Sequence, residues 1–143
     1  MSKYLITGAS RGLGLELIRQ LLTVPKKDVG LIIAVTRNEN APGLQALIAD
    51  YQDRVVNIVI PDITDEQSVK KALPEIEQRL PSGVLDVLVN NAGVMPFSSG
   101  TVGAVSNTQL QDVFKTNVCS VQAMTSVLLP LLERGQTRKV INM

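Results

Sequence analysis

The chain contains no histidine and a single cysteine, Cys119, and these shortages exclude several kinds of chemistry. Without histidine there can be no Ser-His-Asp or Cys-His hydrolase and no histidine-ligated metal. One cysteine can form neither an internal disulfide nor a cysteine-rich zinc site. No metal site is therefore expected, and Cys119, which lies among apolar residues, is interpreted as a small packing residue.

Excess charge and long hydrophobic runs are also lacking. The formal net charge is +1, which gives no electrostatic reason to expect nucleic acid or an anionic membrane as a partner. The apolar runs are shorter than a membrane span, and no secretory segment precedes the first glycines. These features favour a cytoplasmic protein. The 143 residues, 45% of them hydrophobic, suit a single globular domain over 1–143.

Apolar runs typical of strands alternate with segments of helical spacing. Strands are predicted at 4–7, 31–36, 55–60, 84–90 and 139–143, and helices at 12–22, 42–51, 64–80 and 107–132. In such an alternation the strands form a parallel sheet with helices on both faces. We therefore predict an α/β fold, a Rossmann-like doubly wound parallel sheet of about five strands in the order 3-2-1-4-5.

Several local predictions accompany these elements. Capping signals at 64–67 and 106–109 mark the starts of the last two helices. Residues 93–106, rich in Gly, Ser and Pro, are predicted to form a loop. Asp86, at the entrance of the strand 84–90, is expected to be solvated. The apolar side chains of 121–132 are interpreted mainly as core.

Residues 7–14, with the sequence T-G-A-S-R-G-L-G, are the most informative stretch, because they connect a strand to a helix. A helix N-terminus presents free backbone N–H groups and the positive end of the helix dipole. Glycines allow a pyrophosphate to approach that backbone closely. The stretch therefore predicts a dinucleotide site, and the alternative is a tight turn whose glycines serve steric needs only.

The end of the second predicted strand indicates which dinucleotide binds. A carboxylate there would accept a hydrogen bond from the ribose of NAD, but the sequence has Thr36 followed by Arg37. Because a guanidinium pairs well with a phosphate, Arg37 and Arg11 favour NADP over NAD. Two alternatives stay open: Arg37 is a solvated loop residue, or Glu39 and not Thr36 faces the ribose.

The glycine stretch resembles the T-G-x-x-x-G-x-G motif of the short-chain dehydrogenase/reductase family. Four further segments are similar to landmarks of that family, in the same order: Asp62-Ile63, the N-N-A-G sequence at 90–93, Asn117, and 140–142. The resemblance covers essentially the whole chain. It implies the NADP(H)-binding Rossmann half of an oxidoreductase that acts on a small carbonyl or alcohol substrate.

The resemblance also implies site residues. The cofactor-binding set is Gly8, Ser10, Arg11, Gly12, Leu13, Gly14, Arg37, Asp62, Ile63, Asn90, Ala92 and Gly93. Asp62 would accept a hydrogen bond from the adenine amino group while Ile63 packs on the ring, although Asp62 also suits a local turn or helix cap. Asn90 and Asn91 would tie neighbouring strand ends together. Asn117 would be the catalytic asparagine that holds a helix kink and a water, and an exposed helix asparagine is the alternative.

Catalysis in that family also needs a serine after the fifth strand and a tyrosine followed four residues later by a lysine. The tyrosines here are Tyr4 and Tyr51, and the residues four positions on are Gly8 and Val55. We therefore expect a chain that is truncated relative to the family and catalytically incomplete by itself. A non-catalytic NADP(H)-binding or interaction module is the alternative. The helix 107–132 would offer an apolar face to a homo-oligomer.

Overall fold

The computed structural model describes residues 1–95 and 101–143, so that residues 96–100 of the predicted loop lie outside the described part. The strands of this described part form one parallel sheet in the order β3-β2-β1-β4-β5. They are β1 (Ser2–Thr7), β2 (Val29–Thr36), β3 (Val55–Val59), β4 (Val87–Asn90) and β5 (Lys139–Asn142). The predicted fold class and strand order are confirmed.

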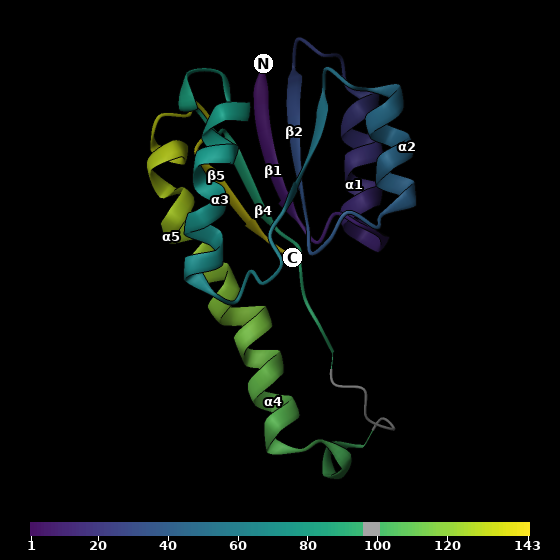
Figure 1. Ribbon diagram of the computed structural model, residues 1–143, viewed down its shortest axis with the longest axis vertical. Coiled ribbons are helices and arrows are strands. Elements are labelled where there is room, and N and C mark those ends of the chain that lie inside the picture. Colours follow the sequence, from purple (N-terminus) through teal and green to yellow (C-terminus); the bar gives the residue numbers. More distant parts are fainter. Residues whose placement is uncertain (96–100) are drawn as a thin grey trace.

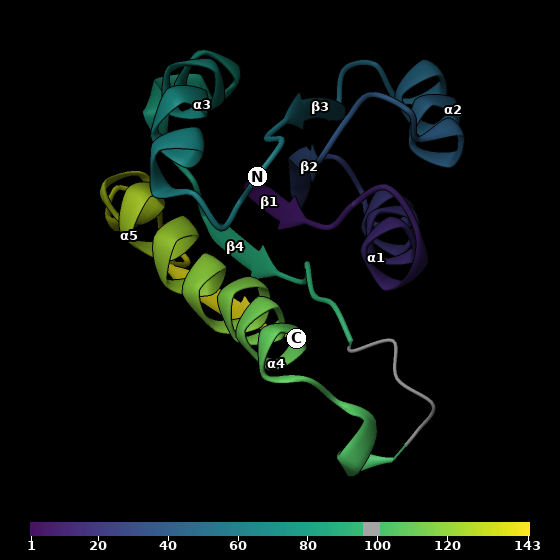
Figure 2. The ribbon, with the colours of Figure 1, turned by 60° about the horizontal axis from the view of Figure 1, so that its bottom comes forward.

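Helices cover both faces of this sheet (Figure 1). Helices α1 (Gly12–Thr23) and α2 (Pro42–Asp50) lie on one side, and α3 (Glu66–Arg79) and α5 (Ser120–Glu133) lie on the other (Figure 2). Each pair closes over its own buried apolar cluster. Because helices cover both faces, β2 buries seven of its eight residues, as its continuous apolar run indicates.

The predicted helix 107–132 is not a single regular helix. It consists of α4 (Asn107–Phe114), a π-helical turn η3 (Lys115–Cys119), and α5. Ser106 and Gln109 form the predicted capping box at its start. In Figure 1, α4 projects beyond the carboxyl ends of the strands. We call α4 and η3 together (residues 107–119) the arm.

Short 3-10 turns and shifted boundaries make up the other differences. The turns are η1 (Pro81–Gly83) and η2 (Val102–Ala104). The side chain that caps α3 is that of Asp65, which accepts a hydrogen bond from the backbone N–H of Gln67, so the predicted cap at Thr64 was wrong by one residue. Thr64 instead donates to Asp62, and this contact leaves Asp65 as the cap.

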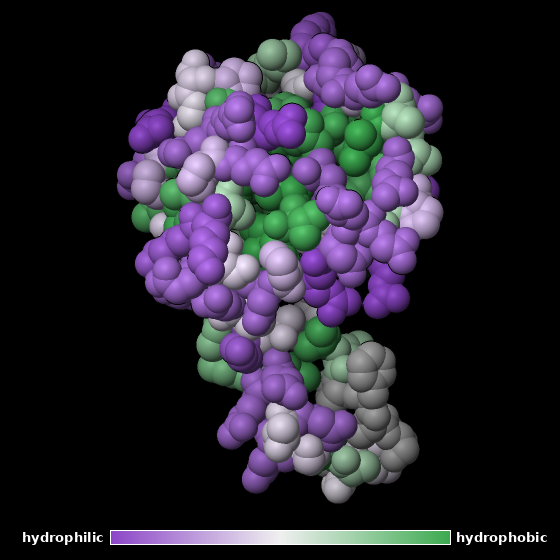
Figure 3. All heavy atoms as spheres, in the orientation of Figure 1, coloured by the Kyte–Doolittle hydropathy of each residue, from purple (hydrophilic) through white to green (hydrophobic). Residues whose placement is uncertain are grey.

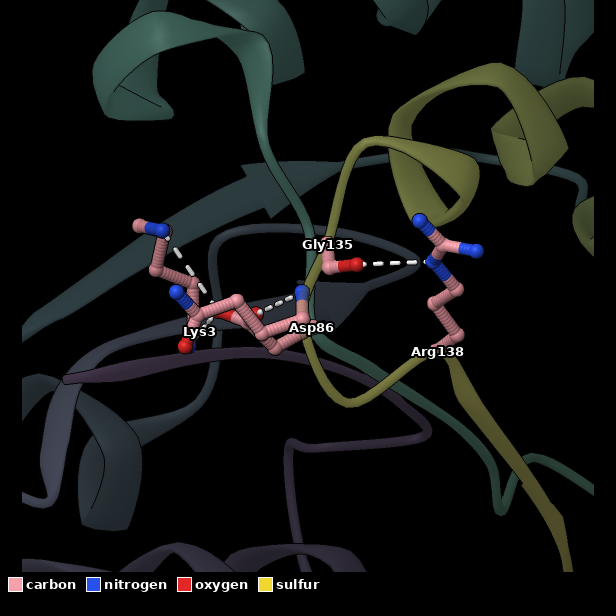
Figure 4. A network of polar contacts seen from close by, with 5 residues as sticks. Lys3, Asp86, Gly135 and Arg138 are labelled. Atoms are coloured by element: carbon pink, nitrogen blue, oxygen red, sulfur yellow. Dashed lines mark hydrogen bonds and ion pairs between the residues drawn. The ribbon is translucent and has the colours of Figure 1, made fainter.

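Asp86 is buried, with 4% of its surface exposed, which corrects the expectation of a solvated residue. Its carboxylate accepts hydrogen bonds from the backbone N–H of Lys3 at 2.9 Å and of Gln136 at 3.1 Å. Figure 4 shows Asp86 beside Lys3. The ammonium of Lys3 lies 3.4 Å from the same carboxylate. Burial raises the pKa of Asp86, but these donors outweigh it and hold the pKa below its ordinary value. Asp86 therefore joins β1 to the turn that precedes β5.

Candidate functional site

The glycine stretch turns sharply between β1 and α1. Gly8 has a φ of +67°, and a Cβ there would lie 2.9 Å from the Cα of Ala92. A Cβ on the buried Gly14 would lie only 2.4 Å from the carbonyl oxygen of Gly8, so the helix packs directly against the turn. Gly12 differs, since its φ is +60° but a Cβ would meet no atom within 4 Å. Packing explains Gly8 and Gly14, whereas Gly12 borders open space.

The N-terminus of α1 carries no side-chain cap. Arg11 occupies the N-cap position without such a hydrogen bond, and the first turn contains no acidic residue. Ser10 is half-buried, while Arg11, Gly12 and Leu13 are exposed. Backbone N–H groups at an uncapped helix start are free to bind an anion. This arrangement fits the predicted pyrophosphate position.

The segment after β4 is fastened to the glycine stretch. The hydroxyl of Thr7 accepts hydrogen bonds from the backbone N–H groups of Asn91 and Ala92, both at 3.0 Å. The amide group of Asn91 donates to the carbonyls of Thr7 at 3.0 Å and Gly8 at 3.2 Å. The predicted tie between the ends of β1 and β4 is therefore present, and it holds Gly93 on the same edge of the sheet.

Asn90 points toward different elements. Its side-chain amide donates to the Oδ1 atom of Asn142 at 3.0 Å and to the hydroxyl of Thr125 at 3.3 Å. The residue is buried, and its contacts link β4 to β5 and α5. The backbone carbonyl of Asn90 also accepts a hydrogen bond from the N–H of Met143 at 3.0 Å, so side chain and backbone together join the ends of β4 and β5.

Arg37 follows directly on β2, at the same edge as the glycine stretch. The backbone N–H of Ala9 donates to the carbonyl of Val35 at 3.2 Å and so joins the two segments. Arg37 and Glu39 are both exposed, whereas Thr36 is buried. Within 1–95 and 101–143, the side chains of Arg11 and Arg37 make no hydrogen bond or salt bridge with protein atoms. Two unpaired guanidinium groups therefore flank this edge.

Asp62 forms the local turn that its sequence allows. Its Oδ1 atom accepts hydrogen bonds from the hydroxyl of Thr64 at 2.6 Å and from the backbone N–H of Thr64 at 2.8 Å. These two bonds, helped by the charge of Lys115, lower the pKa of Asp62. Ile63 is half-buried and packs against the core cluster below α3 and α5. Asp62 is thus held as a carboxylate at the end of β3, and its contact with adenine stays a prediction.

Asn117 lies in the π-helical turn and binds one residue twice. Its Oδ1 atom accepts from the backbone N–H of Val94 at 2.8 Å, and its Nδ2 atom donates to the carbonyl of Val94 at 2.9 Å. The side chain is therefore more than an exposed helix asparagine, because it fastens the segment after Gly93 to the arm. A π-helical turn is a helix irregularity of the kind often found at functional sites.

Cys119 is exposed, so the interpretation as a packing residue was wrong. The π-helical turn inserts one residue into the helix and shifts the inward-facing position. Ser120 is buried instead, and its hydroxyl donates to the carbonyl of Thr116. Sequence reasoning also missed Asn57, a polar residue inside β3 whose side chain lies beside Thr36. The only sequence signal for it was an asparagine within an apolar strand.

The part of the chain that the structure describes shows no group of three or more residues that would hold a metal ion. Nor does any helix within that part have the length and apolar character needed to cross a membrane.

A parallel sheet in this order, with a glycine turn leading from β1 into α1, defines a Rossmann-type α/β protein. The sequence profile described as short chain dehydrogenase matches residues 3–143. The chain therefore belongs to the short-chain dehydrogenase family.

Curated relatives support the same assignment. The short-chain dehydrogenase/reductase AacuF of Aspergillus aculeatus is 33% identical over 99% of this chain and 53% of its own length. The benzil reductase ((S)-benzoin forming) IRC24 of Saccharomyces cerevisiae is 35% identical over 90% of this chain and 48% of its own. This chain thus spans about half the length of the curated relatives it matches.

Solved structures agree with the fold. The carbonyl reductase Sniffer of D. melanogaster superposes with a TM-score of 0.85 and 31% identity, over 100% of this chain and 61% of that one. The NADPH-bound carbonyl reductase from chicken fatty liver gives a TM-score of 0.81 and 27% identity, over 94% and 52%.

Proposed function

We propose that this chain forms the NADP(H)-binding part of a short-chain dehydrogenase/reductase. The observation that carries the proposal is the pairing of an uncapped α1 N-terminus with the unpaired Arg11 and Arg37 at one edge of the sheet. Backbone N–H groups suit the pyrophosphate, and the two guanidinium groups suit the additional phosphate that distinguishes NADP from NAD. A similar solved carbonyl reductase is described as NADPH-bound.

The remaining predicted contacts surround that edge. Gly8, Ser10, Gly12, Leu13 and Gly14 would hold the pyrophosphate, and Asp62 with Ile63 would face the adenine. The backbone of Asn90, Ala92 and Gly93 would lie beside the second ribose. When bound, the nicotinamide supplies or accepts a hydride, and the residues of this chain bind and orient the cofactor.

The reaction class follows from the family. We infer an oxidoreductase that acts on a small carbonyl or alcohol substrate, which is supported by relatives described as benzil reductase and carbonyl reductase. In that reaction Asn117 would act on the site through its hold on the backbone of Val94.

A non-catalytic NADP(H)-binding module is the second candidate. It concerns these 143 residues taken alone, in which neither Tyr4 nor Tyr51 is followed four positions later by a lysine. Turnover by this chain with NADPH and a carbonyl substrate would overturn the second candidate.

The arm supports a proposal about assembly. Leu110, Phe114 and Val118 are exposed at intervals of four residues and line a groove of about 550 Å³ with Val113 and Asn117. Figure 3 also shows apolar side chains where the arm joins the body of the molecule. We propose that a second copy of this chain covers this face, which would hide the exposed apolar surface from water. A cytoplasmic location stays a prediction.

Titration of the purified chain with NADPH and NADH, followed by nicotinamide fluorescence, tests the proposed function. We expect saturable binding of both, with NADPH bound more tightly. Absence of detectable NADPH binding, in a chain whose circular dichroism shows it folded, would overturn the proposal.

A further inference from the structure

Thr36, the last residue of β2, is a polar residue in a strand that is otherwise apolar. Only 3% of its surface is exposed. Its hydroxyl lies 2.8 Å from the carbonyl oxygen of Asn38 and 3.0 Å from the Oδ1 atom of Asn57. A buried hydroxyl needs such partners, because an unpaired one would lose its bonds to water without compensation.

Asn57 is the second polar exception, since asparagine is disfavoured in strands. In the parallel register of β2 and β3, Ala34 pairs with Asn57 and Thr36 pairs with Val59. Residues two apart in a strand share one face, so Asn57 lies diagonally opposite Thr36 on the same face of the sheet. Each of these two polar side chains therefore provides a hydrogen-bond partner for the other.

The contact lies where the chain leaves the sheet. The backbone N–H of Ile60 donates to the carbonyl of Thr36 at 2.9 Å, in continuation of the β2–β3 ladder. Arg37 is the next residue, and it lies outside the paired residues of β2 and β3. The bond from the Thr36 hydroxyl to the Asn38 carbonyl then closes a small ring around the backbone of Arg37. This ring restricts the backbone dihedrals of Arg37.

Asn57 controls which way the Thr36 hydroxyl points. A hydroxyl has one hydrogen, so it cannot donate fully to the Asn38 carbonyl and to the Asn57 oxygen at once. A half-turn of the Asn57 amide, which leaves the heavy atoms in place, presents its NH₂ group to the hydroxyl oxygen. The hydroxyl hydrogen is then free for the Asn38 carbonyl. In that orientation the Thr36 hydroxyl, the Asn38 carbonyl and the Asn57 amide would each have a partner, and the ring around Arg37 would be strengthened.

We propose that Thr36 and Asn57 are positioning residues that determine the preference for NADP(H) over NAD(H) by fixing the backbone of Arg37. This inference rests on the proposed function, in which Arg37 binds the additional phosphate. The Arg37 side chain has no protein partner within the described residues, so the position of its backbone decides where the guanidinium reaches. Misplacing a charged donor by a fraction of an ångström weakens a bidentate contact strongly.

Binding measurements on matched variants test the proposal. Dissociation constants for NADPH and NADH are measured for the unaltered chain, Thr36→Val, Asn57→Val and Thr36→Ser. Thr36→Val and Asn57→Val should weaken NADPH binding about three- to tenfold, the size of one lost hydrogen bond. NADH binding should change less than twofold. Thr36→Ser keeps the hydroxyl and should therefore retain the preference for NADPH.

Two controls separate positioning from a general loss of structure. Gln45→Ala removes a 2.7 Å hydrogen bond to the carbonyl of Glu39, in the same loop but outside the ring, and should leave the NADPH-to-NADH ratio unchanged. In an Arg37→Ala background, Asn57→Val should have no further effect on NADPH binding, because the residue it positions is gone. Asn57 is half-buried on an edge strand, so this variant keeps the test available if Thr36→Val unfolds.

The positioning role would be overturned if the substitutions weakened the binding of NADPH and NADH equally. It would also be overturned if Asn57→Val weakened NADPH binding as much in the Arg37→Ala background as in the unaltered chain. Either result would leave the proposed function intact. A folded, unaltered chain that shows no preference for NADPH would instead overturn the proposed choice of cofactor, and the positioning role with it.

Discussion

Arg37 is exposed at the end of β2, and its guanidinium is available to a ligand at the edge that the glycine stretch also borders. Arg37→Asp should therefore reverse the cofactor preference. We expect NADPH affinity to fall by roughly 10- to 100-fold, the scale of a charge-assisted contact, and NADH affinity to hold or rise, because a carboxylate there accepts from a ribose hydroxyl. Fluorescence titration with both cofactors measures this.

Arg79→Asp is the matched control for Arg37→Asp. It makes the same change of charge at an exposed position in the last turn of α3. If both variants lose NADPH affinity equally, the effect is one of overall charge, and Arg37 has no particular role.

Asp86 is a structural carboxylate, and its substitution should show in stability. Asp86→Asn should lower the free energy of unfolding at pH 7 by about 2 kcal/mol, because buried donors lose a charged acceptor. Since folding lowers the pKa of Asp86 from 3.8, its contribution is fully present above that value and is lost as the pH falls through the lower pKa of the folded protein. Urea denaturation at pH 7 and near pH 3 should show the difference between the two proteins shrinking with acid. A constant difference would contradict the electrostatic role.

Arg54 is a buried residue whose contacts could not be predicted from the sequence. Its guanidinium donates to the carbonyls of Leu22 at 3.0 Å, Val24 at 2.8 Å and Val29 at 3.0 Å. These groups end α1 and begin β2, so Arg54 satisfies carbonyls that the helix leaves free. Because these carbonyls lie about 30 positions before Arg54, no local sequence pattern indicates that Arg54 contacts them.

At the scale of elements, the join between β1 and α1 depends on two glycines in different ways. Gly14→Ala places a methyl group on the carbonyl of Gly8, so α1 must shift, and we expect stability to fall by about 1–3 kcal/mol together with cofactor binding. Gly12→Ala meets open space, so it should cost only about 1 kcal/mol of backbone strain while its methyl group obstructs the ligand.

The two variants are compared by urea denaturation and by NADPH titration. Gly12→Ala should lose proportionally more binding than stability, and Gly14→Ala should lose both. If Gly12→Ala binds NADPH as the unaltered chain does, the open side of the turn does not face the cofactor.

The strands were predictable as elements because helices cover both faces of the sheet and require continuous apolar runs, as in β2. The π-helical turn η3 was not, since α4 and α5 each have a regular helical pattern and one inserted residue leaves little trace in it. That shift explains why Cys119 is exposed and Ser120 buried.

For the whole molecule, the arm is the feature with the clearest consequence. Phe114 is 60% exposed on α4, so Phe114→Glu should reduce self-association while leaving the fold intact. Sedimentation velocity over a range of concentrations measures it. Leu129→Glu alters an equally apolar residue that is 46% exposed on α5, and we expect it to associate as the unaltered chain does. Unchanged association of Phe114→Glu would show that the arm is not the interface.

The sequence by itself determined the fold class, the strand order, the glycine turn and the family, because apolar periodicity and glycine spacing are local properties of the chain. Only the tertiary structure decided how Asn57 meets Thr36, how Arg54 closes α1, and how Asn117 holds Val94. These contacts join residues more than 20 positions apart. Their partners are chosen by strand register and helix packing, which exist only once the sheet has formed.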